Sequence, residues 1–460
     1  MTTSRRTVLT ALALTAAALA GCSSSPSMDY PPVVFVHGNG DSAALWQTTM
    51  WRFESNGWPR DRLYAINVPY PSSRDDDTVA QAGRTSTAEH MAFLRSEVDA
   101  VLARTGAQQV VLMGNSRGGY AIRNYIARGG GAAKVREVVL GGTPNHGVWA
   151  IPGYREGNEF SGTGPFLKAL NAPRNAASDE IDGPARWLTV RSDGDDKFAQ
   201  PDGLWIGRPG LPTFVTAAGP ELRGATSVVI PKIDHRETSF SPAAFDASWR
   251  FLTGGAPFTS TVQVESAPVL DGIVSGLGVA GNAAAGNLSN NLPVAGATVE
   301  IYATDADTGA RRGGPVHRQT VGADGRWGPF SAAPGVPYEF VVTAQGYAIT
   351  HIYRSGFPRS SNIVHLRAER IVDAERTAQA VVSFTRPRGY FDLQRDSATF
   401  DGSSTLPDVP PTSGAGVAAS KRLLADATDR AIVGTFNGEK VVGRTWPLAG
   451  GHLAFLELTY

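Results

Sequence analysis

Cysteine is almost absent from this chain, because its 460 residues contain one, Cys22. A single thiol excludes an intrachain disulfide. An excess of charge is also missing, since 42 Lys and Arg balance 42 Asp and Glu. A neutral chain has no long-range field that attracts nucleic acid, so we expect no nucleic-acid partner. The apolar run over residues 8–20 is shorter than the roughly 20 residues that a bilayer-spanning helix needs.

The first 22 residues are typical of an export signal. Arg5 and Arg6 precede the apolar run, as in signals of the twin-arginine pathway. The run ends in Leu-Ala-Gly-Cys, which resembles a lipobox, in which the cysteine is acylated and becomes the mature N-terminus. We therefore predict a signal over residues 1–22, a lipid anchor on Cys22 and a tether over residues 23–30. This predicts an exported, membrane-anchored lipoprotein; a secreted protein with an ordinary cleaved signal and an incidental cysteine is the alternative.

Residues 31–253 alternate short β-branched runs with helical stretches. Continuous apolar runs of this length are typical of strands buried on both faces of a parallel sheet. Residues 87–104 and 116–128 carry apolar side chains at helical spacing. Strands interleaved with helices predict an α/β domain with a mostly parallel central sheet. The expected strands are residues 33–36, 63–68, 110–113, 135–140, 187–190 and 228–230.

Two further segments complete this predicted domain. Residues 147–184 have no clean periodicity and many Gly, Asn and Pro residues. Such an insertion is either a lid or cap over an active site or an ordinary structural elaboration. Residues 241–252 are expected to form a closing helix, with Ser241 as N-cap and Pro242 in its first turn.

The chain changes character after the Gly- and Pro-containing residues 253–257, where we place the domain boundary. Alternating apolar and polar residues, with Asp-Gly and Asn-Gly turn signals at 324–325 and 437–438, predict an all-β C-terminal region. A helix is expected only over residues 418–427. Segments within 293–347 resemble prealbumin-like sandwiches, so we predict a β-sandwich module over 258–370 and a further β domain over 371–460.

The strongest chemical signal is Gly114-Asn115-Ser116-Arg117-Gly118, which lies between a predicted strand and a predicted helix. This is the context of a nucleophile elbow, where the serine occupies a strained strand-to-helix turn. The residues two before and two after the serine must be small, and Gly114 and Gly118 meet that requirement. The sequence therefore predicts Ser116 as a nucleophile.

A serine nucleophile needs a base, which in this fold follows the serine and an acid along the chain. His235 follows the predicted strand at 228–230 and still belongs to the α/β region. A solvent-exposed loop histidine is the alternative reading. The other candidates lie on a predicted helix, too early in the chain, or in the β region: His90, His146, His317, His351, His365 and His452.

The loop after residues 187–190 offers four candidates for the acid that orients the base, namely Asp193, Asp195, Asp196 and Asp202. Each is compatible with a solvated acid, a loop hydrogen-bond acceptor or part of a weak cation site. The catalytic aspartate would hold the imidazole in one tautomer and stabilise the imidazolium without taking the proton.

An oxyanion hole requires backbone N–H groups aimed at the tetrahedral intermediate. One is expected from Arg117, the residue after the nucleophile, and the second from the loop after an early strand. Residues 33–36 lead into the glycine-containing segment 37–40, whose backbone can approach a substrate closely. We expect His37 to be structural, packing under this loop.

These motifs together resemble bacterial lipases of the α/β-hydrolase superfamily. The resemblance rests on residues 35–38, the elbow at 114–118, the segment 140–147 and the segments around Asp196 and His235. The overall plan is similar to two-domain archaeal and bacterial lipases, whose C-terminal β-barrel assists lipid binding.

The resemblance implies specific roles. In the lipase pattern the catalytic aspartate precedes a Gln-Pro pair by four and five residues, and the pair Gln200-Pro201 selects Asp196. By the same register, the backbone N–H of Asn39 supplies the second oxyanion donor. The implied function is hydrolysis of carboxylic esters of water-insoluble acyl lipids through an acyl-enzyme, at an interface.

Several alternatives share this machinery. They are a carboxylesterase for small esters, a polyester depolymerase, an acyltransferase, and a surface-binding protein whose hydrolase domain is vestigial. We expect no metal or organic cofactor, because the histidines are dispersed without metal-ligand spacing. A chain ending at Pro257 is expected to keep measurable activity on soluble esters and to act more weakly on emulsions, and loss of both activities alike would mean that the β region is needed for folding.

Overall fold

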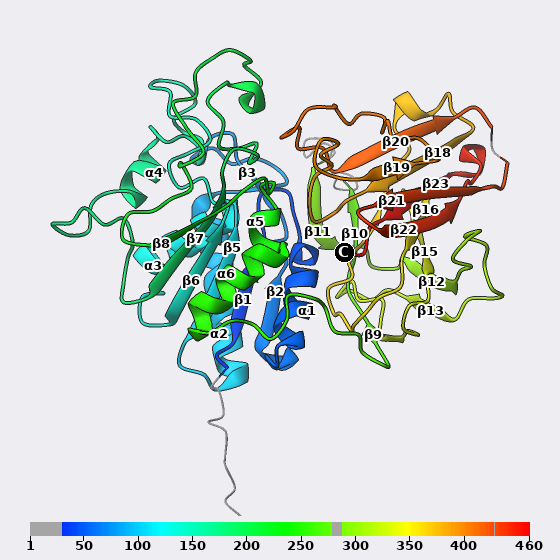
Figure 1. Ribbon diagram of the computed structural model, residues 1–460, viewed down its shortest axis with the longest axis horizontal. Helices are drawn as coiled ribbons and strands as arrows, with labels where there is room; N and C mark the ends of the chain where they lie inside the picture. Colours follow the sequence, from blue (N-terminus) through cyan, green and yellow to red (C-terminus); the bar gives the residue numbers. More distant parts are fainter. Residues whose placement is uncertain (1–29, 278–287, 427) are drawn as a thin grey trace, which may run out of the picture. The chain divides into compact units, whose positions relative to one another are not determined.

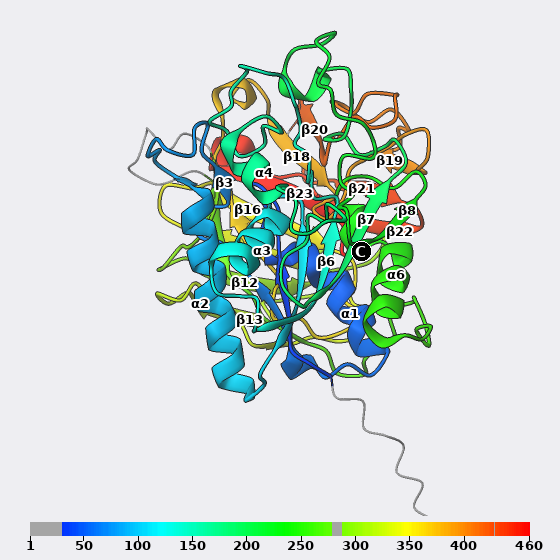
Figure 2. The same ribbon diagram turned by 90° about the vertical axis from the view of Figure 1, so that its left-hand side faces the viewer.

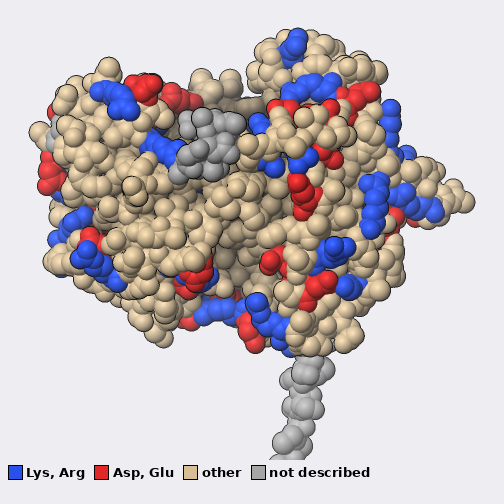
Figure 3. Space-filling model, turned by 180° about the vertical axis from the view of Figure 1, so that it is seen from behind, with Lys and Arg blue, Asp and Glu red and all other residues tan. Residues whose placement is uncertain are grey.

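The computed structural model describes residues 30–277, 288–426 and 428–460. The predicted signal, Cys22 and residues 23–29 of the tether lie outside this description. Within it, no helix is both long and apolar enough to span a membrane. An α/β region is followed by a region built mostly of β-sheets (Figure 1). Lys and Arg are interspersed with Asp and Glu on the face shown in Figure 3, as the balanced composition predicts.

The α/β region is organised around a six-stranded sheet in the order β2-β1-β5-β6-β7-β8. All its neighbouring strands pair in parallel. This confirms the predicted α/β-hydrolase sheet. The central strands carry continuous apolar runs because helices bury both faces. The strands are β1 Val33–Val36, β2 Leu63–Ile66, β5 Val110–Asn115, β6 Val135–Gly141, β7 Arg186–Ser192 and β8 Thr226–Ile230.

Two layers of helices enclose this sheet. Adjacent strand residues point to opposite faces, so Val34 packs with the cluster that includes Val98 of α2 and Ile122 of α3. Phe35 instead contacts Phe53 of α1, its ring centroid 5.9 Å away, on the other face. Figure 2 shows α2 and α3 on one side of the sheet and α1 and α6 on the other. The helices are α1 Gln47–Ser55, α2 Thr87–Thr105, α3 Arg117–Arg128, α4 Pro165–Leu170, α5 Glu237–Phe240 and α6 Pro242–Thr253.

The ends of two helices follow directly from local sequence. Ser86 and Glu89 form a reciprocal capping box at the start of α2, which ends at Gly106 in the left-handed conformation. The Ser241 hydroxyl accepts a hydrogen bond from the N–H of Ala244 at the start of α6. The predicted closing helix and its cap are therefore confirmed.

The C-terminal region is built mostly of β-strands, as predicted. Its largest sheet has the order β13-β12-β15-β16-β23-β18-β20, and three smaller sheets have the orders β11-β10-β17, β19-β21-β22 and β14-β9. Asn437 and Gly438, both with positive φ, form the two-residue turn between β21 and β22, as the Asn-Gly signal predicts. The strands are β9 Val269–Leu270, β10 Val274–Leu277, β11 Ser289–Pro293, β12 Thr298–Ala303, β13 His317–Thr320, β14 Phe330–Ser331, β15 Tyr338–Thr343, β16 Ile349–Arg354, β17 Leu366–Ala368, β18 Ala380–Thr385, β19 Ala398–Phe400, β20 Ala419–Leu424, β21 Ala431–Phe436, β22 Glu439–Arg444 and β23 His452–Glu457.

The largest sheet extends across the boundary placed near residue 370. β16 pairs in parallel with β23, which pairs in parallel with β18. The prediction of a helix over residues 418–427 is wrong for those of its residues that the structure describes. β20 (Ala419–Leu424) lies there and pairs antiparallel with β18. Pairing with a buried neighbouring strand outweighs the weak helical preference of this segment.

The two regions share a packed junction. Trp51 of α1 is buried in the apolar cluster of the β region, and its indole N–H donates to the carbonyl of Ser360 at 2.8 Å. Its ring lies edge-on to Phe357, with the centroids 6.3 Å apart. The Asn291 side chain donates to the carbonyls of Asp41 and Val68, each at 2.9 Å. Part of the β-region core is therefore completed by the α/β region.

Candidate active site

Ser116 lies on the turn between β5 and α3, with φ of 53° and ψ of −124°. This positive φ is unfavourable for a residue with a side chain and persists only when the surroundings enforce it. Here the Ser116 N–H donates to the carbonyl of Gly141 in β6, and its carbonyl accepts from the N–H of Gly119, both at 3.0 Å. The backbone thus has the strained conformation expected of a nucleophile elbow.

The flanking glycines allow this turn to pack against β1. A Cβ placed on Gly118 would lie 2.4 Å from the carbonyl oxygen of Val36 and 2.7 Å from that of His37. A Cβ on Gly114 would lie 2.7 Å from the Ile122 side chain and 2.9 Å from the nitrogen of Gly119. A side chain at Gly118 would push the serine turn away from the end of β1, and one at Gly114 would push α3 away from β5, so the requirement for small residues has a direct steric cause.

His235 lies in the connection from β8 to α5, and Asp196 lies in the loop that follows β7. The imidazole Nδ1 is 2.8 and 2.9 Å from the two carboxylate oxygens of Asp196. Both residues are buried. The Phe198 N–H donates to Asp196 Oδ1 at 2.9 Å, which fixes the carboxylate toward the ring. The structure therefore brings together the acid and base that the lipase register selects.

The neighbouring acids have other contacts. Asp193 accepts from the N–H of Lys232 at 2.9 Å, and Asp202 accepts from the N–H of Leu204 at 3.0 Å. Burial raises the pKa of Asp195, and the nearby Asp392 adds to this effect. In the described parts of the chain, no hydrogen bond joins these three aspartates to His235.

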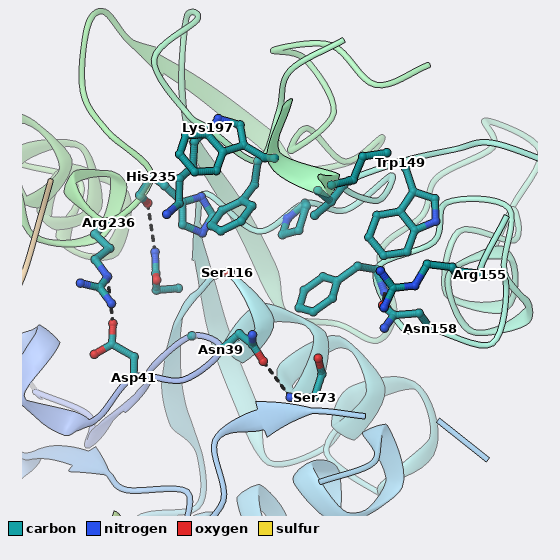
Figure 4. Close-up of a pocket in the computed structure, with 18 of the residues that line it drawn as sticks. Asn39, Asp41, Ser73, Ser116, Trp149, Arg155, Asn158, Lys197, His235 and Arg236 are labelled. Carbon is teal, nitrogen blue, oxygen red and sulfur yellow. Dashed lines mark hydrogen bonds and ion pairs between the residues drawn. The ribbon is translucent and has the colours of Figure 1, made fainter. Parts of the chain in front are cut away.

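The second ring nitrogen of His235, Nε2, belongs to the side of the ring that lines the cavity with Ser116. Nε2 is buried, and within residues 30–277, 288–426 and 428–460 it has no hydrogen-bond partner. Ser116 and His235 line the same cavity (Figure 4). The Phe198 ring lies edge-on to the imidazole, with the centroids 4.5 Å apart, and restricts its rotation. The arrangement leaves Nε2 available to accept a proton.

The candidate oxyanion donors lie on rigid supports. The Asn39 side-chain oxygen accepts from the N–H of Ser73 at 2.8 Å (Figure 4), which holds the loop after β1. His37 is fully buried beneath this loop, and its Nε2 accepts from the N–H of Val68 at 3.1 Å. Arg117 is the first residue of α3, so its backbone N–H has no acceptor within the helix.

The Arg117 side chain connects the elbow to the insertion that follows β6. Its guanidinium makes two hydrogen bonds to Glu159, at 2.6 and 2.9 Å, and further bonds to the carbonyls of Pro71 and Thr85. Both partners of this ion pair are buried. Burial raises the pKa of Glu159, and Arg117 opposes that shift. The pair fixes residue 159 of the insertion next to the elbow.

The cavity above Ser116 has a volume of about 460 Å³. Its walls combine aromatic and aliphatic side chains with a smaller number of charged groups (Figure 4). Residues from the insertion and from the loop after β7 both contribute, so the insertion lines the cavity. The apolar and aromatic lining residues are Pro144, Val148, Trp149, Phe160, Phe198, Trp205, Ile206 and Tyr390.

Sequence reasoning did not single out most of the lining residues, and Lys197 and Tyr390 are two of these. Lys197 places its ammonium 4.8, 4.7 and 4.1 Å from the ring centroids of Phe198, Trp205 and Tyr390. Burial lowers the pKa of Lys197 to about 8. Tyr390 comes from the β region, almost 200 residues after Lys197 in the chain, and no local motif marks it. Only the tertiary fold shows that the β region forms part of the cavity wall.

No group of three or more His, Cys, Asp or Glu side chains able to hold a metal ion occurs in the part of the chain that the structure describes. The cavity contains one histidine, His235, whose Nδ1 is already engaged by Asp196. The charged side chains that line the cavity are Asp41, Asp75, Arg155, Lys197 and Arg236.

The parallel sheet and the strained serine turn define an α/β-hydrolase, and two family models refine this assignment. Residues 30–157 match the class 2 lipase model, and residues 274–371 match the lipase C-terminal domain model. The chain therefore has an α/β-hydrolase fold whose first part matches the class 2 lipase family, and it continues into a β-rich region that matches a lipase C-terminal domain.

The chain also resembles individual proteins. It is 27% identical over 117 residues to a non-heme haloperoxidase of Rhodococcus erythropolis, which covers 25% of this chain and 37% of that protein. The lipase BlEst2 of Bacillus licheniformis in its propeptide form is 14% identical, over 92% of this chain and 94% of that chain, with a TM-score of 0.36. Lipase B of Aspergillus fumigatus is 13% identical, over 51% and 55% of the two chains, with a TM-score of 0.35. These TM-scores are too low to support a structural argument.

Proposed function

We propose that this protein hydrolyses carboxylic esters through an acyl-enzyme, with Ser116 as nucleophile, His235 as base and Asp196 as the acid that orients it. The single observation that carries this proposal is the buried Nδ1 contact of His235 with Asp196, which leaves Nε2 directed to the Ser116 cavity without a partner. The Asp196 contact fixes the proton on Nδ1, so Nε2 can act as a base.

The reaction follows in two steps. Ser116 Oγ attacks the ester carbonyl while Nε2 of His235 takes the hydroxyl proton, and the tetrahedral intermediate forms. Collapse of this intermediate transfers the proton to the leaving alcohol and leaves the acyl group on Ser116. Water then attacks the acyl-enzyme with the same base and releases the acid.

Backbone amides would stabilise the intermediate. The N–H groups of Asn39 and Arg117 are the proposed donors to the oxyanion. Their contribution is large because a rigid donor does not reorganise as the charge forms, and loss of one such donor costs about 3 kcal/mol of transition-state stabilisation. The Ser73 contact and the Arg117–Glu159 ion pair supply that rigidity here.

The substrates we propose are esters of water-insoluble acyl lipids. The walls of the cavity present five aromatic residues, and an acyl chain gains free energy when it leaves water for such surfaces. We also propose that Cys22 carries a lipid anchor that keeps the exported enzyme at a membrane. This part of the proposal rests on the sequence of residues 1–22.

The test is release of p-nitrophenol from a series of p-nitrophenyl esters with acyl chains from two to sixteen carbons. We expect turnover that is lost in Ser116→Ala and retained in Ser96→Ala, which changes an exposed serine of α2. A preference for long chains supports a lipase, and a preference for short chains points to a carboxylesterase. Wild-type protein that releases no p-nitrophenol from any ester would refute the proposed function.

A further inference from the structure

His235 lies in a short turn that is held together by its own acidic residues; we name residues 234–237 the histidine turn. The Asp234 Oδ1 atom accepts from the N–H groups of Arg236 and Glu237, at 2.8 and 2.9 Å. In return, the Asp234 N–H donates to Glu237 Oε2 at 2.8 Å. This reciprocal pattern resembles a capping box and fixes the backbone on both sides of His235.

The remaining oxygens of these two acids are bound by the β region. Arg386 donates from Nη1 to Asp234 Oδ2 at 3.1 Å and from Nη2 to Glu237 Oε1 at 2.5 Å. The Tyr390 N–H donates to Asp234 Oδ2 at 2.7 Å. Arg395 donates to Glu237 Oε2 at 2.5 Å. Donors from about 150 residues downstream therefore hold both acids of the turn.

Arg386 is placed to satisfy both acids at once because its planar guanidinium forms a fork of donors. Its own position is fixed by burial and by a hydrogen bond to the carbonyl of Tyr390. The ring of Phe436 packs against the same guanidinium, with its centroid 4.5 Å from the Arg386 Cζ atom. A lysine could contact one acid as a point charge but could not reproduce the fork.

The electrostatic role of Arg386 follows from burial. Asp234 and Glu237 are 6% and 9% exposed, and Arg386 is 5% exposed. Burial raises the pKa of Asp234, and the adjacent Glu237 raises it further, whereas Arg386 lowers it. Without Arg386, Arg395 would still bind Glu237, but the buried Asp234 carboxylate would lose its ion pair beside that acid until it took up a proton or the turn moved. Either change weakens the hydrogen bonds that fix His235.

We propose that Arg386 of the β region is a positioning residue that holds the histidine turn, and through it His235, in the geometry required for proton transfer. The proposal rests on the proposed function of Ser116 and His235. It gives the β region a role in the chemical step as well as in the cavity wall, and this role applies to soluble substrates as much as to lipids. Arg386 acts through the turn, since its side chain binds Asp234 and Glu237.

The experiment compares Arg386→Gln and Arg386→Lys in the full-length protein, with Arg354→Gln as the matched control. Arg354 is also a buried arginine of the β region and pairs with Glu457, and among the residues that the structure describes no hydrogen bond or ion pair joins it to the histidine turn. For each variant, kcat and KM are measured on p-nitrophenyl butyrate. Rates are divided by the concentration of Ser116 labelled to completion by a p-nitrophenyl phosphonate, so that loss of folded protein does not count as loss of rate.

We expect Arg386→Gln to lower kcat by roughly 10- to 100-fold, the range that loss of a hydrogen bond to a charged group produces. KM should stay within about twofold, because Arg386 does not line the cavity above Ser116. Arg386→Lys should recover part of kcat by restoring the charge, and Arg354→Gln should leave kcat per labelled serine unchanged.

Two results would overturn the inference while leaving the proposed function intact: wild-type kcat per labelled serine in Arg386→Gln, or an equal loss in Arg354→Gln. Should Arg386→Gln fail to fold, Glu237→Gln neutralises one of the two acids that Arg386 binds, and Arg395→Gln shows how much of the effect comes from the Arg395 pair with the same acid. A kcat in Glu237→Gln that is lower than in Arg395→Gln supports the inference, and one that is not lower overturns it. Absence of both labelling and turnover in the wild type would instead refute the proposed function itself.

Discussion

The serine turn and the histidine turn are supported in different ways. The serine turn is held by the α/β region alone, through the pairing of β5 with β6 and the close approach of Gly118 to the end of β1. The histidine turn also depends on side chains and backbone of the β region, chiefly Arg386 and Tyr390. The comparison shows that the proposed catalytic site combines a locally determined element with one that is completed by a distant part of the chain.

The largest effect is expected from removing the β region. A chain that ends at Pro257 lacks Arg386 and Tyr390 and exposes Trp51, which is 1% exposed in the full chain. We therefore expect loss of activity on soluble and emulsified esters alike, in contrast to the expectation from sequence that soluble-ester activity would remain. Assays of the purified fragment on p-nitrophenyl butyrate would check this. Wild-type rates per labelled serine would mean that the α/β region alone holds the histidine turn in place, as it holds the serine turn.

Replacement of Asp196 should disturb the His235 ring without removing the β-region contacts that hold the histidine turn. We expect Asp196→Ala to lower kcat by about 10,000-fold, because the imidazole loses its tautomer control. Asp193→Ala should lower kcat by less than about tenfold, since Asp193 contacts the backbone of Lys232 and the Ser192 hydroxyl. Steady-state kinetics on a soluble ester measures both changes, and a larger loss in Asp193→Ala would reassign the acid.

The junction between the regions should be visible in thermal stability. Trp51→Ala is expected to destabilise the protein by about 3–5 kcal/mol, since it removes a buried aromatic side chain from the β-region cluster. Trp58→Ala is the matched comparison, because Trp58 packs against Phe53 and Trp249 within the α/β region. Differential scanning calorimetry should show one transition that shifts in both variants. A separate transition of the β region whose temperature does not change in Trp51→Ala would contradict the coupling between the two regions.

The smallest effect on stability is expected from removing the N-cap of α6, which is determined by local sequence. Ser241→Ala removes the N-cap of α6 and should cost about 1 kcal/mol of stability. Ser248→Ala, within the same helix, removes only a bond to the carbonyl of Ala244 and should cost less. Urea unfolding followed by circular dichroism compares the two variants. An equal cost at both positions would show that the cap does not set the start of α6.

Sequence reasoning predicted the features that local rules determine. The buried strands, the capped helix after Ser241 and the elbow glycines follow from periodicity and steric limits within a few residues. The register of the Gln200-Pro201 pair chose Asp196 among four acids, and the structure places that residue against His235.

The remaining features depend on contacts that no local pattern encodes. Tyr390 reaches the cavity and Arg386 reaches the histidine turn only because the β region packs against the α/β region. The same applies to β20 (Ala419–Leu424), where pairing with β18 overrides a helical preference. The sheet that continues past residue 370 joins segments more than 100 residues apart, which composition and periodicity do not connect.

The order of strands in the seven-stranded sheet has a consequence for synthesis. β23 (His452–Glu457) is the last strand in the chain, yet it lies between β16 and β18 and pairs with both. β18 leads directly into Arg386. A polypeptide that has not yet reached β23 therefore cannot complete this sheet, and the strand that leads into Arg386 gains this neighbour only once β23 has been made.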